Sequence, residues 1–346
     1  MASEVYMHRC LELARLGAGM VSPNPMVGAV LVWNNQIIGE GWHQQWGDAH
    51  AEVNCLKNVP PEHQNLISES TLYCNLEPCS HQGKTPPCAD LIIKHKIPRV
   101  VVANIDPNPL VAGKGIQKMR SAGIDVKTGL LASEGTWLNR SFFTWIQSKR
   151  PYIILKWAQS ADGFLGKSQE RVVISGPLTQ RLVHRWRSEC DAILVGSNTA
   201  WVDNPRLDNR FYPGKKPTRI VLGTNRQIPD HFHLLDETQE TWFIGKKEIA
   251  QGNRTKFLYQ SEPVSLSWLM EELFRQNKAI LLVEGGAQVL HQFLLQGFWD
   301  ELRVIENPIR LQEGIPAPAV PESAKLKETW SIGADDIHIF ARPSMQ

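Results

Sequence analysis

The sequence predicts an α/β protein of two domains, and three observations support this prediction. Extended apolar runs alternate with amphipathic helical patterns along the whole chain. The length of 346 residues corresponds to roughly two domains at about 150 residues each. A short polar segment that ends in proline, residues 147–151, separates two series of such elements. We therefore expect domains at residues 1–147 and 148–346, each with helices covering a sheet.

The first series of elements opens with a helix. Residues 4–18 are amphipathic and end at a pair of glycines. The extended runs 26–33 and 36–42 are joined by Asn34 and Asn35, which tolerate positive φ, so these runs predict a hairpin. The elements expected after it are a helix at 50–57, a strand at 71–75, a helix at 86–94, a strand at 99–104, a helix at 113–122, a strand at 125–128 and a helix at 132–147.

The second series begins directly after Pro151 and repeats the alternation. We expect helices at 178–189, 267–276 and 287–295. Residues 315–323 are rich in proline and alanine, which indicates a surface loop. The strands expected in this domain are 152–158, 192–196, 219–223, 241–244, 279–284, 302–306 and 337–341.

The composition excludes several classes of protein. The 37 basic and 35 acidic residues leave a net charge of +2, too small a surplus for a protein that coats nucleic acid. The sequence contains no run of about 18 apolar residues, as a membrane span would need, and no secretory signal pattern at its start. Six cysteines without an export signal indicate reduced thiols or metal ligands. We expect a cytoplasmic protein with neither membrane nor nucleic acid as a partner.

One constellation has the composition of a catalytic zinc site. His50, Cys79 and Cys88 supply one imidazole and two thiolates, and three protein ligands leave the fourth tetrahedral position open for water. Zinc lowers the pKa of such a water to about 7, and the carboxylate of Glu52 would move its proton. Because positions i and i+2 do not share a helix face, His50 and Glu52 can meet only at the N-terminal end of a helix.

Alternatives to this interpretation remain open. The His-x-Glu and Pro-Cys…Cys pattern is the signature of zinc nucleobase deaminases. A structural zinc site is the alternative, and it would take His81 as a fourth ligand. Iron or cobalt would also accept this ligand set. The remaining cysteines, which we expect to be small buried side chains, are Cys10, Cys55, Cys74 and Cys190.

Eight residues separate the two cysteines of the site, and with this spacing the run 78–88 resembles the bifunctional riboflavin-biosynthesis deaminase/reductase family. Runs 24–30, 41–43 and 106–109 match other deaminase motifs of that family in order. The resemblance implies a cytidine-deaminase-like three-layer domain. It also implies that zinc-activated water deaminates a diaminopyrimidinone that carries a 5-phosphoribosylamino group. The implied substrate-binding residues are Asn24, His43, His81, Lys84, Asp106 and Asn108.

The second domain resembles the reductase half of the same family, which has a dihydrofolate-reductase-like fold. The matching runs are 155–163, 191–196, 199–207 and 283–286. The resemblance implies NADPH reduction of the ribosyl group to ribityl, with Lys156 or Asp203 as the proton donor. The implied substrate-binding residues are Lys156, Arg187, Leu207, Arg210 and Glu284. The implied cofactor-binding residues are Ala158, Thr199, Asp203, Thr224, Gly286, Ala287, Gln288 and Val289.

One run departs from the family pattern of Ser-x-Trp-Ile-Thr. This chain has Arg171 and Val173 in place of the serine and tryptophan. Arg171 would replace a hydroxyl contact to the substrate phosphate, whereas Val173, at the cofactor position, cannot stack as tryptophan does. If residues 171–175 determine the efficiency of the reductase, we therefore expect weakened reduction.

Two other functions compete with this interpretation. One is a deaminase of tRNA or single-stranded nucleic acid with an accessory domain, which the near-neutral charge and the cysteine spacing disfavour. The other is a zinc-stabilised binding protein without enzymatic activity. By the same resemblance, a homo-oligomer formed through the reductase half is expected.

Overall fold

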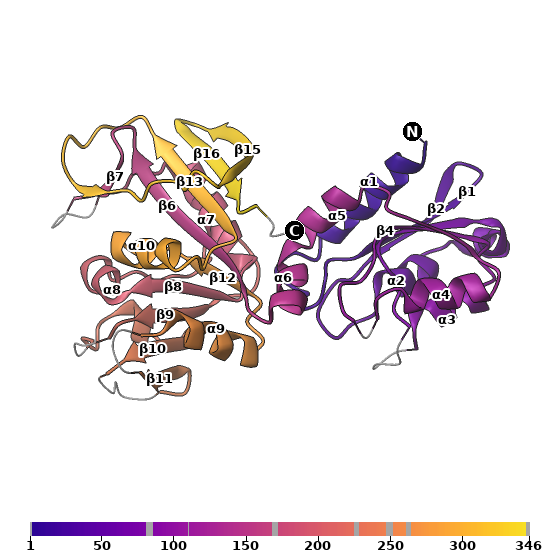
Figure 1. Cartoon of the computed structure of the whole chain (residues 1–346), viewed down its shortest axis with the longest axis horizontal. Helices are drawn as coiled ribbons and strands as arrows, with labels where there is room; N and C mark the ends of the chain where they lie inside the picture. The colour runs from indigo at the N-terminus through magenta and orange to yellow at the C-terminus, as the bar shows by residue number, and fades with distance from the viewer. Residues whose placement is uncertain are drawn as a thin grey trace. The chain divides into compact units, whose positions relative to one another are not determined.

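The structure, a computed structural model, describes residues 2–80, 86–109, 111–167, 172–224, 228–246, 252–260 and 264–343. The chain divides into two compact units, Met1–Lys149 and Arg150–Gln346 (Figure 1). The division falls within the polar segment 147–151. No helix within the described ranges is long and apolar enough to cross a membrane.

The first unit is built on a five-stranded sheet of order β2-β1-β3-β4-β5. β1 pairs antiparallel with β2 and β3, whereas β3, β4 and β5 are parallel. The predicted hairpin forms, and Asn34 and Asn35 in its turn have positive φ values of 44° and 62°. The strands are β1 (Gly28–Trp33), β2 (Gln36–Trp42), β3 (Thr71–Leu76), β4 (Arg99–Asn104) and β5 (Asp125–Thr128).

Helices cover both faces of this sheet, so the three-layer prediction is confirmed (Figure 1). Successive strand residues point to opposite faces, and Val30 and Leu31 accordingly lie in two separate buried clusters. One face carries α1 (Ala2–Arg15) and α5 (Ala132–Leu138), and the other carries α2 (Ala51–Lys57), α3 (Cys88–Lys94) and α4 (Lys114–Ser121). The 3₁₀ helix η1 (Pro61–Glu69) precedes β3.

The second unit contains a nine-stranded sheet of order β11-β10-β9-β8-β12-β6-β13-β16-β15. The strands from β11 to β13 are parallel, and β16 is antiparallel to both of its neighbours. The strands are β6 (Tyr152–Ser160), β8 (Ala192–Gly196), β9 (Thr218–Leu222), β10 (Thr241–Gly245), β11 (Thr255–Tyr259), β12 (Ile280–Val283), β13 (Glu301–Asn307), β15 (Lys325–Ile332) and β16 (Asp335–Ala341).

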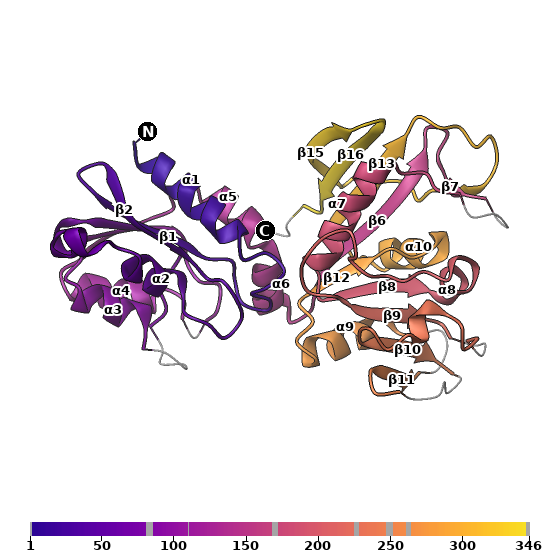
Figure 2. The same cartoon turned by 180° about the vertical axis from the view of Figure 1, so that it is seen from behind.

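Helices lie on both faces of the second sheet as well (Figures 1 and 2). α9 (Leu266–Arg275) and α10 (Ala287–Leu295) pack with Leu155 of β6. α7 (Pro177–Ser188) lies on the opposite face, where its Trp186 ring is 4.7 Å from the Arg303 guanidinium. This arrangement agrees with the expected α/β domain.

The structure corrects several predicted elements. The helix predicted over 132–147 is interrupted at Asn139 and continues as α6 (Arg140–Ser148). Asn139 leaves the helical pattern because its side chain holds the backbone of Met26 through two hydrogen bonds of 2.8 and 2.9 Å. The elements without a prediction are the helices η1, α8 (Ser197–Asp203) and η2 (His233–Leu235) and the strands β7 (Phe164–Gly166), β11, β14 (Ile315–Pro316) and β15.

Two of these differences, and the shifted start of one predicted helix, have a direct physical reason. β15 is exposed along most of its length, so it lacks the apolar alternation that identifies a half-buried strand. β14 forms inside the predicted loop 315–323 because it pairs with β7, a contact between distant segments of the chain. Prolines shift the start of the helix predicted at 86–94, and α3 begins at Cys88 with Pro87 as its N-cap.

Candidate active sites

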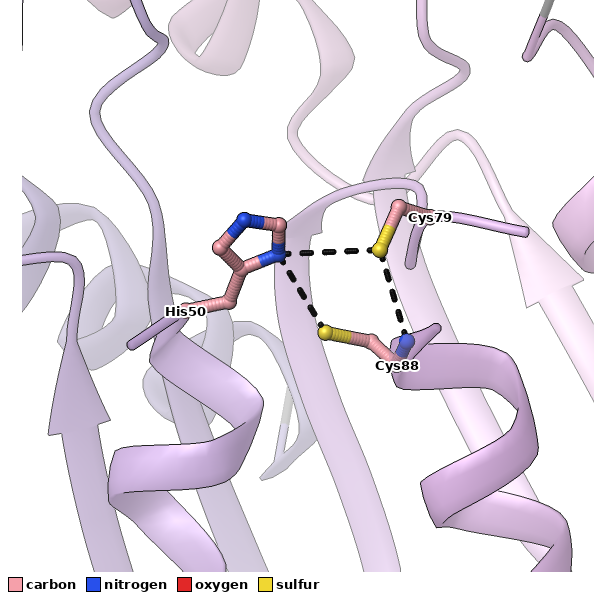
Figure 3. A group of neighbouring side chains, drawn as sticks. All are labelled: His50, Cys79 and Cys88. Atoms are coloured by element: carbon pink, nitrogen blue, oxygen red, sulfur yellow. Dashed lines mark hydrogen bonds between the residues drawn. The ribbon is translucent and has the colours of Figure 1, made fainter. Parts of the chain in front are cut away.

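The three predicted metal ligands meet where two helices begin and one strand ends (Figure 3). His50 is the N-cap of α2, and Cys88 is the first residue of α3. Cys79 follows the carboxyl end of β3 after a short turn. Each ligand therefore lies at or just after the end of a helix or strand.

The distances between the ligands fit a tetrahedral metal ion. His50 Nδ1 lies 3.6 Å from Cys79 Sγ and 3.4 Å from Cys88 Sγ. With Zn–N of about 2.0 Å and Zn–S of about 2.3 Å, the N–S edge of a tetrahedron is about 3.6 Å. The ligand atoms all lie within 4.8 Å of one another. These three donors thus have both the chemistry and the spacing for zinc.

The electrostatics of the two cysteines favour a thiolate. Hydrogen bonds from Cys88 and His50 lower the pKa of the Cys79 thiol to about 4. The pKa of Cys88 is raised instead, because its thiol is hydrogen-bonded to Cys79 and is buried. The backbone N–H of Cys88 also donates to Cys79 Sγ over 3.3 Å. Because the thiolate is the form that binds metal, the lowered pKa of Cys79 favours metal binding at this pair of cysteines.

The carboxyl group of Glu52 lies beside the predicted metal ligands, as the sequence predicts. The helix starts at Ala51, so Glu52 lies in the first turn of α2, immediately after the His50 N-cap. Only 3% of Glu52 is exposed, and this burial raises the pKa of its carboxyl group. A raised pKa makes a carboxylate a better proton acceptor, which is a property that a proton shuttle needs.

Two predicted substrate residues of this unit contact each other. Asn24 Nδ2 donates a hydrogen bond to His43 Nε2 over 3.3 Å, and His43 Nδ1 lies 3.1 Å from the carbonyl oxygen of Ala49. The His43 and His50 rings meet edge to face at 5.6 Å. Burial lowers the pKa of His43, so its ring is neutral and accepts from Asn24. These contacts place Asn24 and His43 next to the metal ligands.

The other predicted substrate residues of this unit divide into two groups. Asp106 and Asn108 lie on the loop after β4, where Asp106 Oδ1 accepts the backbone N–H of Asn108 over 2.8 Å. His81 and Lys84 lie outside the described residues.

The second unit contains a cleft of about 1030 Å³ at the carboxyl ends of its parallel strands. Parallel α/β sheets typically bind ligands at this edge. The strands β6, β8, β9 and β12 supply residues at or directly after their ends. The predicted residues that line the cleft are Lys156, Ala158, Val173, Arg187, Thr199, Asp203, Leu207, Arg210, Glu284, Gly286, Ala287, Gln288 and Val289.

A buried ionic group occupies the base of this cleft. The Arg187 guanidinium donates two hydrogen bonds to Glu284, from Nε to Oε1 (2.9 Å) and from Nη2 to Oε2 (2.8 Å). Lys156 Nζ lies 3.7 Å from the same Oε2. Although burial opposes ionisation, Arg187 and Lys156 hold the pKa of Glu284 at about 2. Burial lowers the pKa of Lys156.

This geometry changes the role expected for Arg187. The sequence suggests its guanidinium fork as a phosphate clamp, but the fork is engaged by Glu284. A third hydrogen bond runs from its Nη1 to the carbonyl oxygen of Asp208 over 3.0 Å. Arg210, whose side chain is 47% exposed, is the more accessible cation of the cleft.

Glycines allow the elements around the cleft to approach closely. A Cβ atom on Gly285 would lie 2.8 Å from Val289 Cβ, and one on Gly286 would lie 2.9 Å from Thr199 Oγ1. Gly286 is the N-cap of α10 and provides no side-chain cap, and this helix begins at the cleft. This helix start is suited to an anionic group such as a pyrophosphate.

Similar proteins are known across the full length of the chain. Residues 151–335 match the RibD C-terminal domain family, and residues 1–104 match the cytidine and deoxycytidylate deaminase zinc-binding region. Riboflavin biosynthesis protein RibD of Aquifex aeolicus is 38% identical over 97% of this chain and 98% of that protein. RibD of Actinobacillus pleuropneumoniae is 42% identical over 95% of this chain and 93% of that protein.

A solved structure has the same fold over both units. It is a diaminohydroxyphosphoribosylaminopyrimidine deaminase/5-amino-6-(5-phosphoribosylamino)uracil reductase from Thermotoga maritima, 31% identical with a TM-score of 0.91 and 99% of each chain covered. The chain belongs to the RibD family. It is accordingly a bifunctional deaminase and reductase of riboflavin biosynthesis.

The matches to RibD proteins agree with the division of the chain. The RibD C-terminal match begins at residue 151, next to the start of the second unit. The deaminase match ends at residue 104, the last residue of β4, and includes all three metal ligands. The dihydrofolate-reductase-like prediction for the second domain and the cytidine-deaminase-like prediction for the first are both confirmed.

Some predicted residues of the RibD reductase half lie elsewhere, and some residues escaped prediction. Thr224 is not among the residues that line the cleft, and only 2% of it is exposed. Arg171 lies outside the described residues, and Val173 is 60% exposed at the cleft. His184 of α7 lines the cleft without having been predicted, since the sequence places it among arginines on one helix. Glu77 also escaped prediction, although it stands directly before Pro78 and Cys79.

Proposed function

We propose that the chain deaminates 2,5-diamino-6-(5-phosphoribosylamino)pyrimidin-4-one and then reduces the ribosyl group of the product to ribityl with NADPH. The observation that carries the proposal is the His50, Cys79 and Cys88 cluster beside buried Glu52, in a chain with a separate reductase cleft. The similarity to the Thermotoga maritima deaminase/reductase supports the choice of substrate. Deamination of nucleic acid is not favoured.

In the first unit the residues divide the work of deamination. Zinc, when bound by His50, Cys79 and Cys88, supplies a water molecule with a pKa of about 7. Glu52 would accept one proton of this water and deliver it to the amino nitrogen of the ring. The water oxygen would bond to the amino-bearing ring carbon, the carbon–nitrogen bond would break and ammonia would leave. The second water proton would remain on the adjacent ring nitrogen of the carbonyl product. Asn24 and His43 bind the edge of the pyrimidine.

In the second unit the residues bind the sugar and provide a proton. NADPH, when bound in the cleft, would supply the hydride for C1′ of the ribosyl group. Lys156 donates the accompanying proton to the ring oxygen or nitrogen, because its lowered pKa makes it a stronger acid than an ordinary lysine. Glu284 holds the Lys156 ammonium in place at 3.7 Å. The N-terminus of α10 binds the cofactor phosphates.

The proposal also includes the cellular location. All six cysteines are free, and five of them are buried. Thiols kept reduced in this way are typical of a cytoplasmic protein. A reducing compartment also keeps Cys79 and Cys88 available for a metal ion.

The test follows both reactions in one protein. The purified chain is incubated with the diaminopyrimidinone substrate and NADPH, while ammonia release and the loss of nicotinamide absorbance are measured separately. Glu52→Gln should lower deamination by about 10²–10⁴-fold and leave reduction of the deaminated substrate unchanged. Lys156→Met should lower reduction by about 10²-fold or more and leave deamination unchanged.

A matched control variant is Glu4→Gln, which changes an exposed carboxylate of α1 and should affect neither reaction. If the unmodified chain releases no ammonia from this substrate, the proposed deamination is wrong. If Glu52→Gln deaminates at the full rate, Glu52 does not move the proton.

A further inference from the structure

A single buried carboxylate, that of Glu77, joins the loop that carries Cys79 to the loop that follows β4. Glu77 comes directly after β3, and only 4% of it is exposed. Its Oε2 accepts hydrogen bonds from the backbone N–H groups of Asp106 over 3.2 Å and of Gly113 over 2.9 Å. Its Oε1 accepts from the backbone N–H groups of Gly115 over 3.0 Å and of Ile116 over 3.2 Å. Asp106 and Gly113 lie between β4 and α4, and Gly115 and Ile116 lie in the first turn of α4.

The sheet places Glu77 at the start of both loops. β3 and β4 are parallel neighbours, with Leu76 opposite Asn104 in register. Their carboxyl ends therefore lie at the same edge of the sheet, and the backbone N–H of Glu77 donates to Asn104 over 2.9 Å. The chain continues from one strand to Cys79 and from the other to Asp106. A side chain at position 77 is thus within reach of both loops.

The start of α4 is adapted to receive this carboxylate. The first N–H groups of a helix have no partner within the helix, and the N-cap of α4, Gly113, provides no side-chain cap. A negative charge at this end is stabilised by the helix dipole. A Cβ atom on Gly115 would lie 2.1 Å from the carbonyl oxygen of Pro78, so only glycine allows this approach.

We propose that Glu77 is a positioning residue of the deaminase, which holds the Asp106–Asn108 loop in register with the metal ligand Cys79. The inference rests on the proposed function, in which Asp106 and Asn108 bind the substrate. A glutamine at position 77 keeps the size of the side chain but turns its NH₂ group toward two of the N–H donors. Those two hydrogen bonds are then lost, and the loop is released on one side.

The test compares Glu77→Gln with the unmodified chain by hydrogen exchange, zinc content and kinetics. We expect faster amide exchange at residues 106 and 113–116, with zinc bound in the same amount per chain. We expect KM for the diaminopyrimidinone to rise at least about tenfold, with a smaller change in kcat, because the loop binds substrate and takes no part in the proton transfer. Reduction should proceed at the unmodified rate.

Asp191→Asn is the matched control, because Asp191 Oδ2 likewise accepts the backbone N–H groups of Ala279 over 2.9 Å and Ile280 over 3.0 Å, but in the other unit. It should leave the deaminase KM and the exchange of the 106–116 segment unchanged. Unchanged exchange and KM in Glu77→Gln would overturn the proposal. Loss of zinc with a matching fall in kcat would also overturn it, because Glu77 would then act on the metal loop. Exchange and zinc content test the loop even if the unmodified chain does not deaminate this substrate.

Discussion

The metal site of the first unit and the cleft of the second are built in different ways. The candidate zinc ligands and Glu52 come from two short stretches of sequence and lie at or near the ends of α2, β3 and α3. The cleft is lined by residues that extend from Lys156 to Ile315, brought together by the order of the parallel strands. A metal ion needs few donors with strict chemistry, whereas a large substrate and cofactor need many contacts of ordinary chemistry.

This difference determines what a substitution does in each unit. In the first unit one ligand is a large part of the site, and its neighbours cannot replace it. In the second unit Glu284 contacts two cations at once. Removing its charge would therefore leave Lys156 and Arg187 buried without this carboxylate partner. A substitution in the metal site should therefore lower deamination, whereas a substitution in the cleft should lower the stability of the second unit as well as its activity.

The largest effect is expected from Cys88→Ala. Without this thiolate the chain keeps two of its three metal ligands, so zinc binding should fall below one ion per chain and deamination by more than about 100-fold. Reduction should continue, because the cleft contains none of these residues. Metal analysis and the two separate assays measure these outcomes. Cys55→Ala removes a buried thiol from the same unit and should retain zinc; a similar metal loss in both variants would contradict the assignment of Cys88 as a ligand.

The sequence predicts the first site better than the second for a physical reason. His50, Cys79 and Cys88 are identified by residue type and spacing, and the expected meeting of His50 and Glu52 at a helix start is confirmed by the N-cap position of His50. Glu77 escapes because its partners are backbone N–H groups, which leave no mark in the residue types. In the second unit, the engagement of Arg187 by Glu284 depends on the pairing of distant strands.

The fold shows the same limit. Strands with a buried face were predicted, but the exposed strand β15 has no apolar pattern to reveal it. The break at Asn139 also depends on a distant partner, the backbone of Met26. Patterns that arise from burial can be recognised in a single sequence, whereas hydrogen bonds between distant segments cannot.

A smaller effect, on stability, is expected from Glu284→Gln. Lys156 and Arg187 would keep their charges in a buried site without a carboxylate, which should cost about 3 kcal/mol of the unfolding free energy of the second unit. Because the pKa of Glu284 is held at about 2, below its ordinary 4.5, the ion pair stabilises the fold above pH 4.5. This stabilisation is lost as the pH falls toward 2. Urea denaturation, monitored by hydrogen exchange of the β12 amides, measures this loss of unfolding free energy.

The matched control for Glu284 is Glu189→Gln, at the C-cap of α7. Glu189 pairs with Arg185, whose side chain is 53% exposed, so its removal should cost no more than about 0.5 kcal/mol. Equal losses in the two variants would show that the ion pair in the cleft is no stronger than one at the surface.

The last prediction concerns the pH dependence contributed by His184. Only 5% of this residue is exposed, and its Nδ1 has no hydrogen-bond partner among the residues that the structure describes. Burial, followed by the nearby charges of Arg187 and Arg210, lowers the pKa of His184 to about 4; Asp208 and Glu284 oppose this shift. Below pH 6.5 the unfolded chain therefore binds a proton that the folded chain does not accept until about pH 4. The second unit should lose stability across this interval.

His184→Asn should make the stability of the second unit less dependent on pH between 6.5 and 4, because it removes the group that titrates only in the unfolded chain. Denaturation at several pH values, followed by hydrogen exchange in α7, gives the slope. His291→Asn, at an exposed position of α10, is the matched control and should keep the slope of the unmodified chain. Equal slopes in all three proteins would mean that His184 takes up its proton in the folded cleft. The Arg187 and Arg210 charges would then not control its ionisation.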